Sequence, residues 1–387
     1  MGYSASELFF ALLRARVLGG AGLDDGHRAA LRDDPRTLYD LAVEHDMAHL
    51  IGFSLYEEGL IDLYAPFEQH HMLSVFRHES ILFEQARVSE VLEAASVPHM
   101  PLKGALLRTL YPEGWMRPSC DVDILVRVED LDRALAALSE NGFTVGGKTS
   151  HDVTLSSSGH IPTELHFRLW ENGQSDKICA LLDSVWDTAL PVEGTKYQYA
   201  MTDGLFYFYH VAHMAKHVVH GGCGVRPFLD MWLLDKQGDT AARDQLLAEG
   251  GLLPFAEAAR ALCRVWFEGA PHHEATLALE AFILDGGVYG NENNRVAIGQ
   301  QQRGGRLRYA LSRIFASRDE LKVHFPILER RPWLAPPLQV ARWFKILRRG
   351  DAKRSLDELA YNSSISHDRA FAMKRLLDTL GLPKEGD

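Results

Sequence analysis

The sequence of 387 residues contains no run of 18 or more apolar residues, and this absence argues against a membrane-spanning helix. It has four cysteines, at positions 120, 179, 223 and 263, and no Cys-x-x-Cys pair. Such scattered cysteines are typical of reduced thiols in a cytoplasmic protein, not of a zinc site or a disulfide framework. The N-terminal segment lacks the basic region that begins a signal peptide, so we expect an amphipathic helix there.

Internal repeats, low-complexity tracts and a His-Glu-x-x-His zinc motif are also missing. Hydrophobic residues make up 46% of the chain and charged residues 24%, which is typical of a globular protein. The length predicts two or three domains. We expect a helical N-terminal region at residues 1–85, an α/β core at 86–195 and a helical C-terminal region at 196–387.

Positive charge is scarce overall but concentrated in one segment. The chain carries a net charge of −11, yet residues 303–354 hold 14 Lys and Arg against four Asp and Glu, which leaves −21 on the rest. This asymmetry predicts either an anionic partner for the basic segment or a solvated helical surface. Nucleic acid stays open as a partner, although the overall acidity and the lack of a recognisable RNA-binding module weaken that case.

Helix signals dominate the N-terminal region. Ser4 and Glu7 have the spacing of a capping box, and Asp34 can cap a second helix. A proline-free stretch at residues 67–95, with apolar residues mostly at helical spacing, predicts a long helix. No catalytic signature lies in this region.

The rest of the chain is organised around residues 100–126. Here the sequence predicts a strand at 97–103, a short helix at 105–110 and a second strand that begins with Asp121 and Asp123. Side chains two apart on a strand share a face, so the two carboxylates project together. Their mutual repulsion would be relieved by a hard cation such as Mg²⁺.

A third carboxylate, Glu164, lies on another predicted strand, at residues 164–169. Further short strands are expected at 143–145 and 153–156, with a turn at Gly146-Gly147 between them. Two aspartates on one strand and an acid on its neighbour can hold the metal pair of a nucleotidyl transferase. An Asp-x-Asp pair alone is common and usually marks a solvated loop or strand edge.

Four short motifs together resemble a known family. They are Lys103-Gly104, Arg117-Pro118, Asp121-Val122-Asp123-Ile124-Leu125-Val126 and Glu164-Leu165-His166. In this order they resemble the bacterial uncharacterised nucleotidyltransferase family of the polymerase-β-type superfamily, most densely over residues 85–170. The resemblance implies an α+β fold, with a small mixed sheet in the core and helical regions on either side.

The resemblance also implies roles for individual residues. Asp121, Asp123 and Glu164 would be catalytic and would bind Mg²⁺ or Mn²⁺. The residues expected to hold the nucleotide and its phosphates are Lys103, Gly104, Arg117, Ser119, His166, His213 and Lys216. One departure matters: the usual Gly-Ser after the first strand is Gly104-Ala105 here, so a phosphate-binding hydroxyl is missing. Lys103, Arg117 or Ser119 are the residues that can replace it.

A predicted helix at residues 205–220 carries histidines at 210, 213, 217 and 220, which the spacing places on one face. Packing, contact with substrate or nucleotide, and metal binding all stay open for this face. On the next helix, Arg226 and Asp230 are four residues apart and predict an ion pair. Gly286-Gly287 and Gly290 are expected to form a flexible loop before a polar segment at 291–305.

The sequence therefore predicts transfer of a nucleoside monophosphate from an NTP, such as ATP, to an acceptor hydroxyl, with release of pyrophosphate. The acceptor can be a small molecule, an RNA end or a protein side chain. One alternative is a non-catalytic nucleotide-binding or interaction module, which the missing serine after Gly104 favours. Another is a metal-dependent hydrolase that uses the histidine face and does not depend on Asp121.

Overall fold

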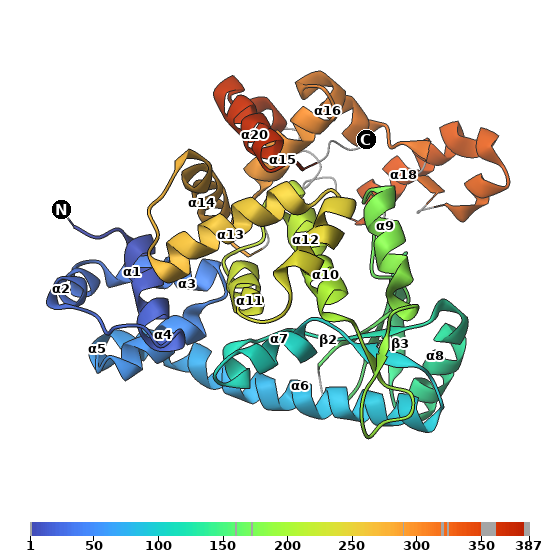
Figure 1. Ribbon diagram of the computed structural model, residues 1–387. Coiled ribbons are helices and arrows are strands. Elements are labelled where there is room, and N and C mark those ends of the chain that lie inside the picture. The colour runs from blue at the N-terminus through green and yellow to red at the C-terminus, as the bar shows by residue number, and fades with distance from the viewer. Residues whose placement is uncertain are drawn as a thin grey trace.

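The structure is a computed structural model that describes residues 2–158, 161–171, 173–288, 290–318, 321–322, 325–349 and 361–382. Figure 1 shows a layer of helices stacked on an α/β layer, with the N-terminal helices at one side. Across the described residues, no helix has both the length and the apolar character needed to cross a membrane.

The N-terminal helices are α1 (Ala5–Leu12), α2 (Asp25–Asp33), α3 (Pro35–Glu44), α4 (Ala48–Glu57) and α5 (Ile61–Tyr64). The capping box predicted at Ser4 is present: its backbone N–H donates to Glu7 Oε2 at 2.7 Å, and its hydroxyl accepts from the Glu7 N–H. Asp34 caps α3 as expected, because its Oδ1 accepts from the Thr37 N–H at 3.1 Å. Local capping chemistry thus fixes where these helices begin.

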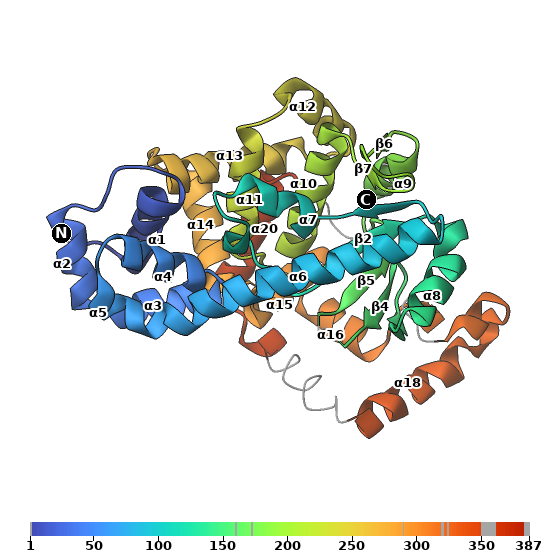
Figure 2. The ribbon, with the colours of Figure 1, turned by 90° about the horizontal axis from the view of Figure 1, so that it is seen from below.

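The predicted long helix is α6 (Glu68–Ala94). It runs along the base of the molecule, contacting α4 near its start and the sheet and α8 (Leu131–Glu140) farther along. Figure 2 shows it lying across the strands. The domain boundary expected at residue 85 therefore lies inside one continuous helix.

The sheet contains five strands in the order β1 (His99–Pro101), β2 (Val122–Val126), β5 (Thr163–His166), β4 (Asp152–Ser156) and β3 (Thr144–Lys148). Strands β2 and β5 pair in parallel and the other pairs are antiparallel, which confirms the predicted α+β fold with a small mixed sheet. The turn predicted at Gly146-Gly147 is wrong. Both glycines lie within β3, where the pairing with β4 shifts register between Val145 and Lys148.

Strand β2 has one apolar and one polar face. Val122, Ile124 and Val126 pack with residues of α6 and α8 in a buried cluster. Asp123 points to the opposite face, as the alternation of strand side chains requires. Between β1 and β2 the chain forms α7 (Gly104–Leu107), a helix of four residues that continues as a 3₁₀ turn.

The C-terminal part is mainly helical, after a two-stranded sheet of β6 (Leu190–Pro191) and β7 (Tyr199–Ala200). Its described helices are α9 (Asp176–Asp183), α10 (Asp203–Val219), α11 (Arg226–Asp235), α12 (Thr240–Glu249), α13 (Leu253–Glu268), α14 (Glu274–Gly286), α15 (Glu292–Gln302), α16 (Arg306–Ile314), α18 (Ala335–Arg349) and α20 (His367–Thr379).

The polar segment at residues 291–305 contains helix α15. The Asn291 side chain caps it by accepting from the Asn294 N–H at 2.7 Å, and Val296 and Ile298 are fully buried. The polar composition hid this buried face because most of the other residues in the segment are Asn, Gln and Arg.

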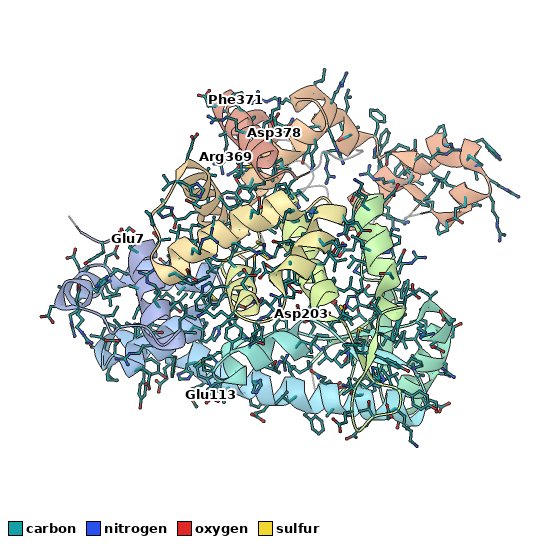
Figure 3. The ribbon with its side chains drawn as sticks, in the orientation of Figure 1. Glu7, Glu113, Asp203, Arg369, Phe371 and Asp378 are labelled. Carbon is teal, nitrogen blue, oxygen red and sulfur yellow. The ribbon has the colours of Figure 1, made fainter. Side chains whose placement is uncertain are left out.

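One large apolar core joins the N-terminal helices to α10, α11 and α13. The Phe10 and Trp266 rings stack within it, with centroids 4.6 Å apart. In Figure 3, Asp203 marks the start of α10 near the α/β layer, whereas Arg369 lies on α20 at the far edge of the helical layer. The helical layer lies over the polar face of the sheet.

Candidate active site

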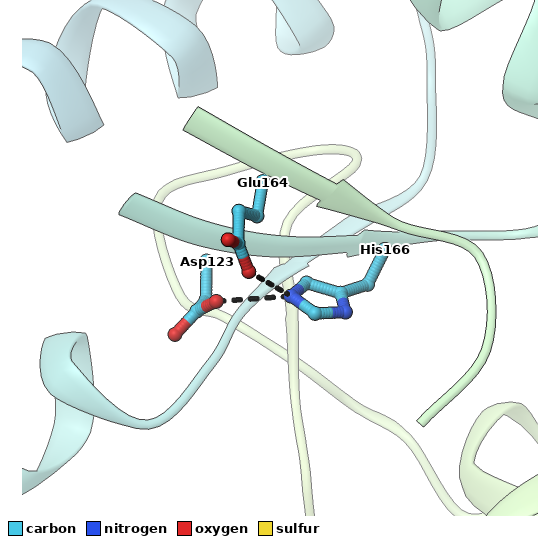
Figure 4. A group of neighbouring side chains, drawn as sticks. All are labelled: Asp123, Glu164 and His166. Atoms are coloured by element: carbon cyan, nitrogen blue, oxygen red, sulfur yellow. Dashed lines mark hydrogen bonds and ion pairs between the residues drawn. The ribbon is translucent and has the colours of Figure 1, made fainter. Parts of the chain in front are cut away.

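Two neighbouring strands bring the acidic residues together. Asp123 on β2 lies opposite Glu164 on β5 in the parallel pairing, and both project to the polar face of the sheet. His166, two residues after Glu164, lies between them (Figure 4). Its Nε2 is 2.9 Å from Asp123 Oδ1 and 3.5 Å from Glu164 Oε2.

This group has the composition of a cation site. Asp123, Glu164 and His166 each offer one ligand atom, and these atoms lie within 4.8 Å of one another. Asp121 does not belong to this group, although the sequence pattern placed it with Asp123 and Glu164. It lines the same cavity, and repulsion from Asp123 and Glu164 acts on its carboxylate.

Electrostatics distinguish the two aspartates. Burial, together with repulsion from Asp123 and Glu164, raises the pKa of Asp121 to about 6. Burial also acts to raise the pKa of Asp123, but the nearby Lys103 and His166 outweigh it and hold that pKa well below its usual value. Carboxylate oxygens are ligands that suit Mg²⁺. The unrelieved repulsion at Asp121 therefore fits a site that takes a divalent cation.

His166 already carries positive charge into this group. Burial disfavours its charged form, but hydrogen bonds to Asp123 and Glu164 outweigh burial and raise its pKa to about 9. A protonated imidazole donates its Nε2–H to the acids and fixes their orientation. The Glu-Leu-His motif thus supplies both an acid and the group that positions it.

Lys103 stands beside the acids in an unusual backbone conformation. Its φ of 25° lies in the left-handed region, which a lysine rarely adopts. Its Nζ lies 5.7 Å from the centre of the Tyr209 ring. Burial disfavours the lysine's charge, but Tyr209, Asp123 and Asp121 outweigh it and raise the lysine pKa above its usual value. Such backbone strain is concentrated at functional sites.

Gly104 and Ser119 meet in a tight contact. A Cβ at Gly104 would lie 3.1 Å from the Ser119 hydroxyl and 3.1 Å from Arg108 Nη2, so only glycine fits without a shift. The buried Arg108 donates from Nε to the Gly104 carbonyl at 2.6 Å and from Nη2 to Ser119 Oγ at 3.2 Å. Arg108 therefore holds the serine hydroxyl next to the glycine turn.

Arg117 is anchored by a buried ion pair. Its Nε lies 2.8 Å from Asp230 Oδ1, and the Tyr111 hydroxyl donates to the same oxygen at 2.8 Å. The ion pair expected between Arg226 and Asp230 is wrong, because Arg226 donates to Asp46 Oδ2 at 2.8 Å instead. Arg226 and Asp230 therefore do not pair within α11, and each pairs with a residue that is distant in the sequence.

Helix α10, which carries three of the four histidines and which we call the histidine helix, lies across the cavity from the sheet. His213 and His217 lie with their Nε2 atoms 3.2 Å apart, and burial is the main reason that the pKa of each is lowered. His210 bonds to the Pro227 carbonyl, and Lys216 donates to Glu171 Oε1 at 2.6 Å. Within the described residues these histidines do not form a candidate metal group, so the structure gives no support to the zinc hydrolase hypothesis.

All ten residues selected from the sequence line one cavity of about 450 Å³ between the sheet and α10. They are Lys103, Gly104, Arg117, Ser119, Asp121, Asp123, Glu164, His166, His213 and Lys216. Sequence reasoning missed six other polar residues in the lining: Asp46, His151, Asp152, Glu171, Gln174 and Tyr209. None of them belongs to a recognisable motif, and only the fold brings them here.

A comparison with protein families gives one match. The family model described as "Uncharacterised nucleotidyltransferase" matches residues 32–268, which is more than half of the chain and includes every residue of the motif set. No curated protein and no solved structure matches the chain.

Proposed function

Since the chain belongs to the uncharacterised nucleotidyltransferase family, we propose that it transfers a nucleoside monophosphate from an NTP to an acceptor hydroxyl at the acidic cavity. The observation that carries the proposal is the meeting of Asp123 on β2 and Glu164 on β5, with Asp121 beside them, in one cavity that also holds Lys103. Acids on adjacent strands and a nearby cation are the groups that phosphoryl chemistry needs.

In this reaction a new bond forms between the acceptor oxygen and the α-phosphorus of the NTP. The bond between the α-phosphorus and the bridging oxygen breaks, pyrophosphate leaves and the hydroxyl loses its proton. Bound Mg²⁺ or Mn²⁺, held by Asp121, Asp123 and Glu164, would neutralise charge on the phosphates and lower the pKa of the acceptor hydroxyl. Glu164, whose side chain is 34% exposed, would accept the proton that the hydroxyl loses.

The chain's own cations would bind the triphosphate. Lys103 faces the acids from the end of β1 and can donate to phosphate oxygens. The Ser119 hydroxyl stands against Gly104, so it is the best candidate to replace the hydroxyl that Ala105 lacks. Arg117 has its Nε engaged by Asp230, so we propose that it shapes the cavity wall and adds positive charge to it.

The histidine helix would contact the nucleotide or the acceptor from the opposite side. His213, half-buried and facing His217, lies in the cavity wall, and desolvation lowers the pKa of both imidazoles, so both are neutral at pH 7. Neutral imidazoles donate or accept hydrogen bonds without adding charge. Such groups suit recognition of a sugar or a base more than of a phosphate.

Calorimetry tests the proposal. We expect wild-type protein to bind at least one of the four NTPs only when Mg²⁺ is present, and the Asp121→Asn/Asp123→Asn variant to lose this binding. The control is Glu129→Gln/Asp132→Asn, which removes two exposed carboxylates at the start of α8 and should bind as wild type does. Mg²⁺-dependent binding without transfer to any acceptor would favour the non-catalytic nucleotide-binding module. Unchanged binding in the Asp121/Asp123 variant would contradict the proposed site.

A further inference from the structure

One buried arginine beside the acidic cavity lacks a counter-charge. The acidic cavity is the space of about 450 Å³ that holds the three acids. Arg108 follows α7 directly and is 5% exposed, and this part of the chain lies between α6 and the helical layer (Figures 1 and 2). Among the described residues, no carboxylate forms an ion pair with Arg108. Its Nη1 is buried and finds no acceptor among them.

Two other arginines with little exposure are paired with an aspartate. Arg117 lies 2.8 Å from Asp230, and Arg243 lies 2.6 Å from Asp203. At Arg108, by contrast, burial lowers the pKa to about 10, and repulsion from Arg117 adds to this. A buried charge without a partner reduces the stability of a fold. The protein therefore retains at Arg108 a charge for which the described residues supply no counter-charge.

The hydrogen bonds of the Arg108 side chain end at the turn that borders the acidic cavity. Its Nε donates to the Gly104 carbonyl at 2.6 Å, and its Nη2 donates to Ser119 Oγ at 3.2 Å. The Ser119 hydroxyl in turn donates to the Asp121 carbonyl at 3.2 Å. Gly104, Ser119 and Asp121 line the cavity, whereas Arg108 stands behind them. Arg108 therefore acts on the cavity through its neighbours.

The direction of these hydrogen bonds limits what the serine can do. A guanidinium has no acceptor, so Ser119 Oγ accepts from Arg108 and the single hydroxyl proton points elsewhere. In the structure this proton goes to the Asp121 carbonyl. A phosphate oxygen beside Gly104 can take the same proton. Because the hydroxyl is polarised by a cation, its hydrogen bond to an anionic oxygen is strengthened.

We propose that Arg108 is a positioning residue for the triphosphate of the NTP. It holds Ser119 as a hydrogen-bond donor to a phosphate oxygen and supplies a charge that the phosphate neutralises. This inference rests on the proposed function, and it requires no contact between Arg108 and the nucleotide. A neutral donor would tether Gly104 and Ser119 as well, so the tether alone gives no reason for the buried charge.

Selectivity for phosphate separates this role from a structural one. The probes are inorganic tripolyphosphate and the α,β-methylene analogue of an NTP that wild type binds, both measured by calorimetry with Mg²⁺, and the matching nucleoside, measured by ligand-observed NMR. We expect Arg108→Gln to weaken binding of the two phosphate compounds about tenfold. Its affinity for the nucleoside should change less than twofold. An equal loss for all three probes would show that only the shape of the cavity changed, and would overturn the inference.

Two further variants test the charge and its route. Arg108→Lys keeps the charge but not the guanidinium fork, so it should bind tripolyphosphate more tightly than Arg108→Gln does. Ser119→Ala should weaken tripolyphosphate binding severalfold. In the double variant Arg108→Gln/Ser119→Ala, the loss should be smaller than the product of the two single losses, because the arginine acts through the hydroxyl. A lysine variant no better than the glutamine variant, or fully multiplicative losses, would overturn the inference.

The matched control is Arg14→Gln. Arg14 is half-buried, donates to the Trp266 carbonyl at 2.7 Å and lies outside the cavity lining. Burial lowers its pKa, as it does for Arg108. This variant should change no affinity more than twofold.

Circular dichroism checks that each variant folds. If Arg108→Gln does not fold, Ser119→Ala decides alone, and unchanged tripolyphosphate affinity in that variant would overturn the inference. Absence of NTP binding by folded wild type would instead contradict the proposed function. NTP binding by wild type that Arg108→Gln leaves within twofold would contradict this inference alone.

Discussion

The acidic cavity and a second cavity of about 380 Å³, which we call the basic cavity, share a wall at Glu171, Gln174, Ala212 and Lys216 but are built in opposite ways. The acidic cavity takes its acids from two adjacent strands, where backbone pairing fixes the distance between Asp123 and Glu164. The basic cavity takes Arg295, Arg303 and Arg313 from helical segments late in the chain.

The difference also shows how each cavity tolerates change. In the acidic cavity, buried groups of opposite charge neutralise one another. Loss of one charge therefore leaves its partner buried without a counter-charge. In the basic cavity, Arg295 and Arg303 are half-buried and Arg313 is exposed, so loss of one charge costs less. Four predictions sharpen this contrast.

The largest effect is expected at Asp123. Asp123→Asn should reduce transfer to a competent acceptor by about 10⁴-fold, because it removes a metal ligand worth several kcal/mol of transition-state stabilisation. Circular dichroism should show an unchanged fold, since asparagine has nearly the same size. Residual activity within tenfold of wild type would show that Asp123 is not a catalytic residue.

The next effect concerns stability at the edge of the acidic cavity. Asp230→Ala should lower the free energy of unfolding by about 3–5 kcal/mol, because it leaves the Arg117 guanidinium without its buried partner. Asp46→Ala breaks the Arg226 ion pair, in which the aspartate side chain is 45% exposed, and should cost less than about 1 kcal/mol. Urea unfolding measures both, and equal losses would contradict the contrast between buried and exposed pairs.

Acid should lower the stability of the whole fold through His45, which lines neither cavity. Burial lowers the pKa of His45 to about 4, from the ordinary 6.5 of an unfolded chain. Between these values the unfolded state binds a proton that the folded state excludes, so stability falls as the pH decreases. From pH 7 to pH 5 the loss from this group is about 2 kcal/mol.

The measurement for His45 is urea unfolding of wild type and His45→Leu at both pH values. Leucine cannot titrate, so the variant should lose about 2 kcal/mol less than wild type over this interval. Identical pH dependence in the two proteins would show that His45 does not stay neutral in the folded state.

The smallest effect is expected at the shared wall. Glu171→Gln removes a carboxylate that lines both cavities and releases Lys216 from its ion pair, so Mg²⁺-NTP should bind severalfold more tightly, within about 1 kcal/mol. The gain should shrink at high salt, because partly exposed charges are screened. Weaker NTP binding in this variant would indicate that the ion pair holds Lys216 in position.

The acidic cavity was largely predictable from the sequence, and the reason is local. Alternation along the strands predicts that Asp123 projects to one face, and the Glu-Leu-His motif places Glu164 and His166 on one face in the same way. Asp121 was expected on the strand but precedes β2, which begins at Val122. The short strands of the mixed sheet were also expected from the sequence. The exception is β3, where two adjacent glycines suggested a turn. The family resemblance supplied the pairing between strands that periodicity alone does not give.

The basic cavity and the buried ion pairs were not predictable, because they join distant segments. Arg117 finds Asp230 across 113 positions, while the spacing of Arg226 and Asp230 pointed to a pair that does not form. The polar segment that becomes α15 hid two buried aliphatic residues. Charge counting located the basic segment but did not show which of its arginines turn inward.

The most direct test of the central claim is the position of a bound metal. Crystals grown with Mn²⁺ and an α,β-methylene NTP analogue should show anomalous density between Asp123 and Glu164, within coordination distance of Asp121, and triphosphate density beside Lys103. Metal density between His213 and His217, or no metal at the acids in a crystal that contains the nucleotide, would contradict the account.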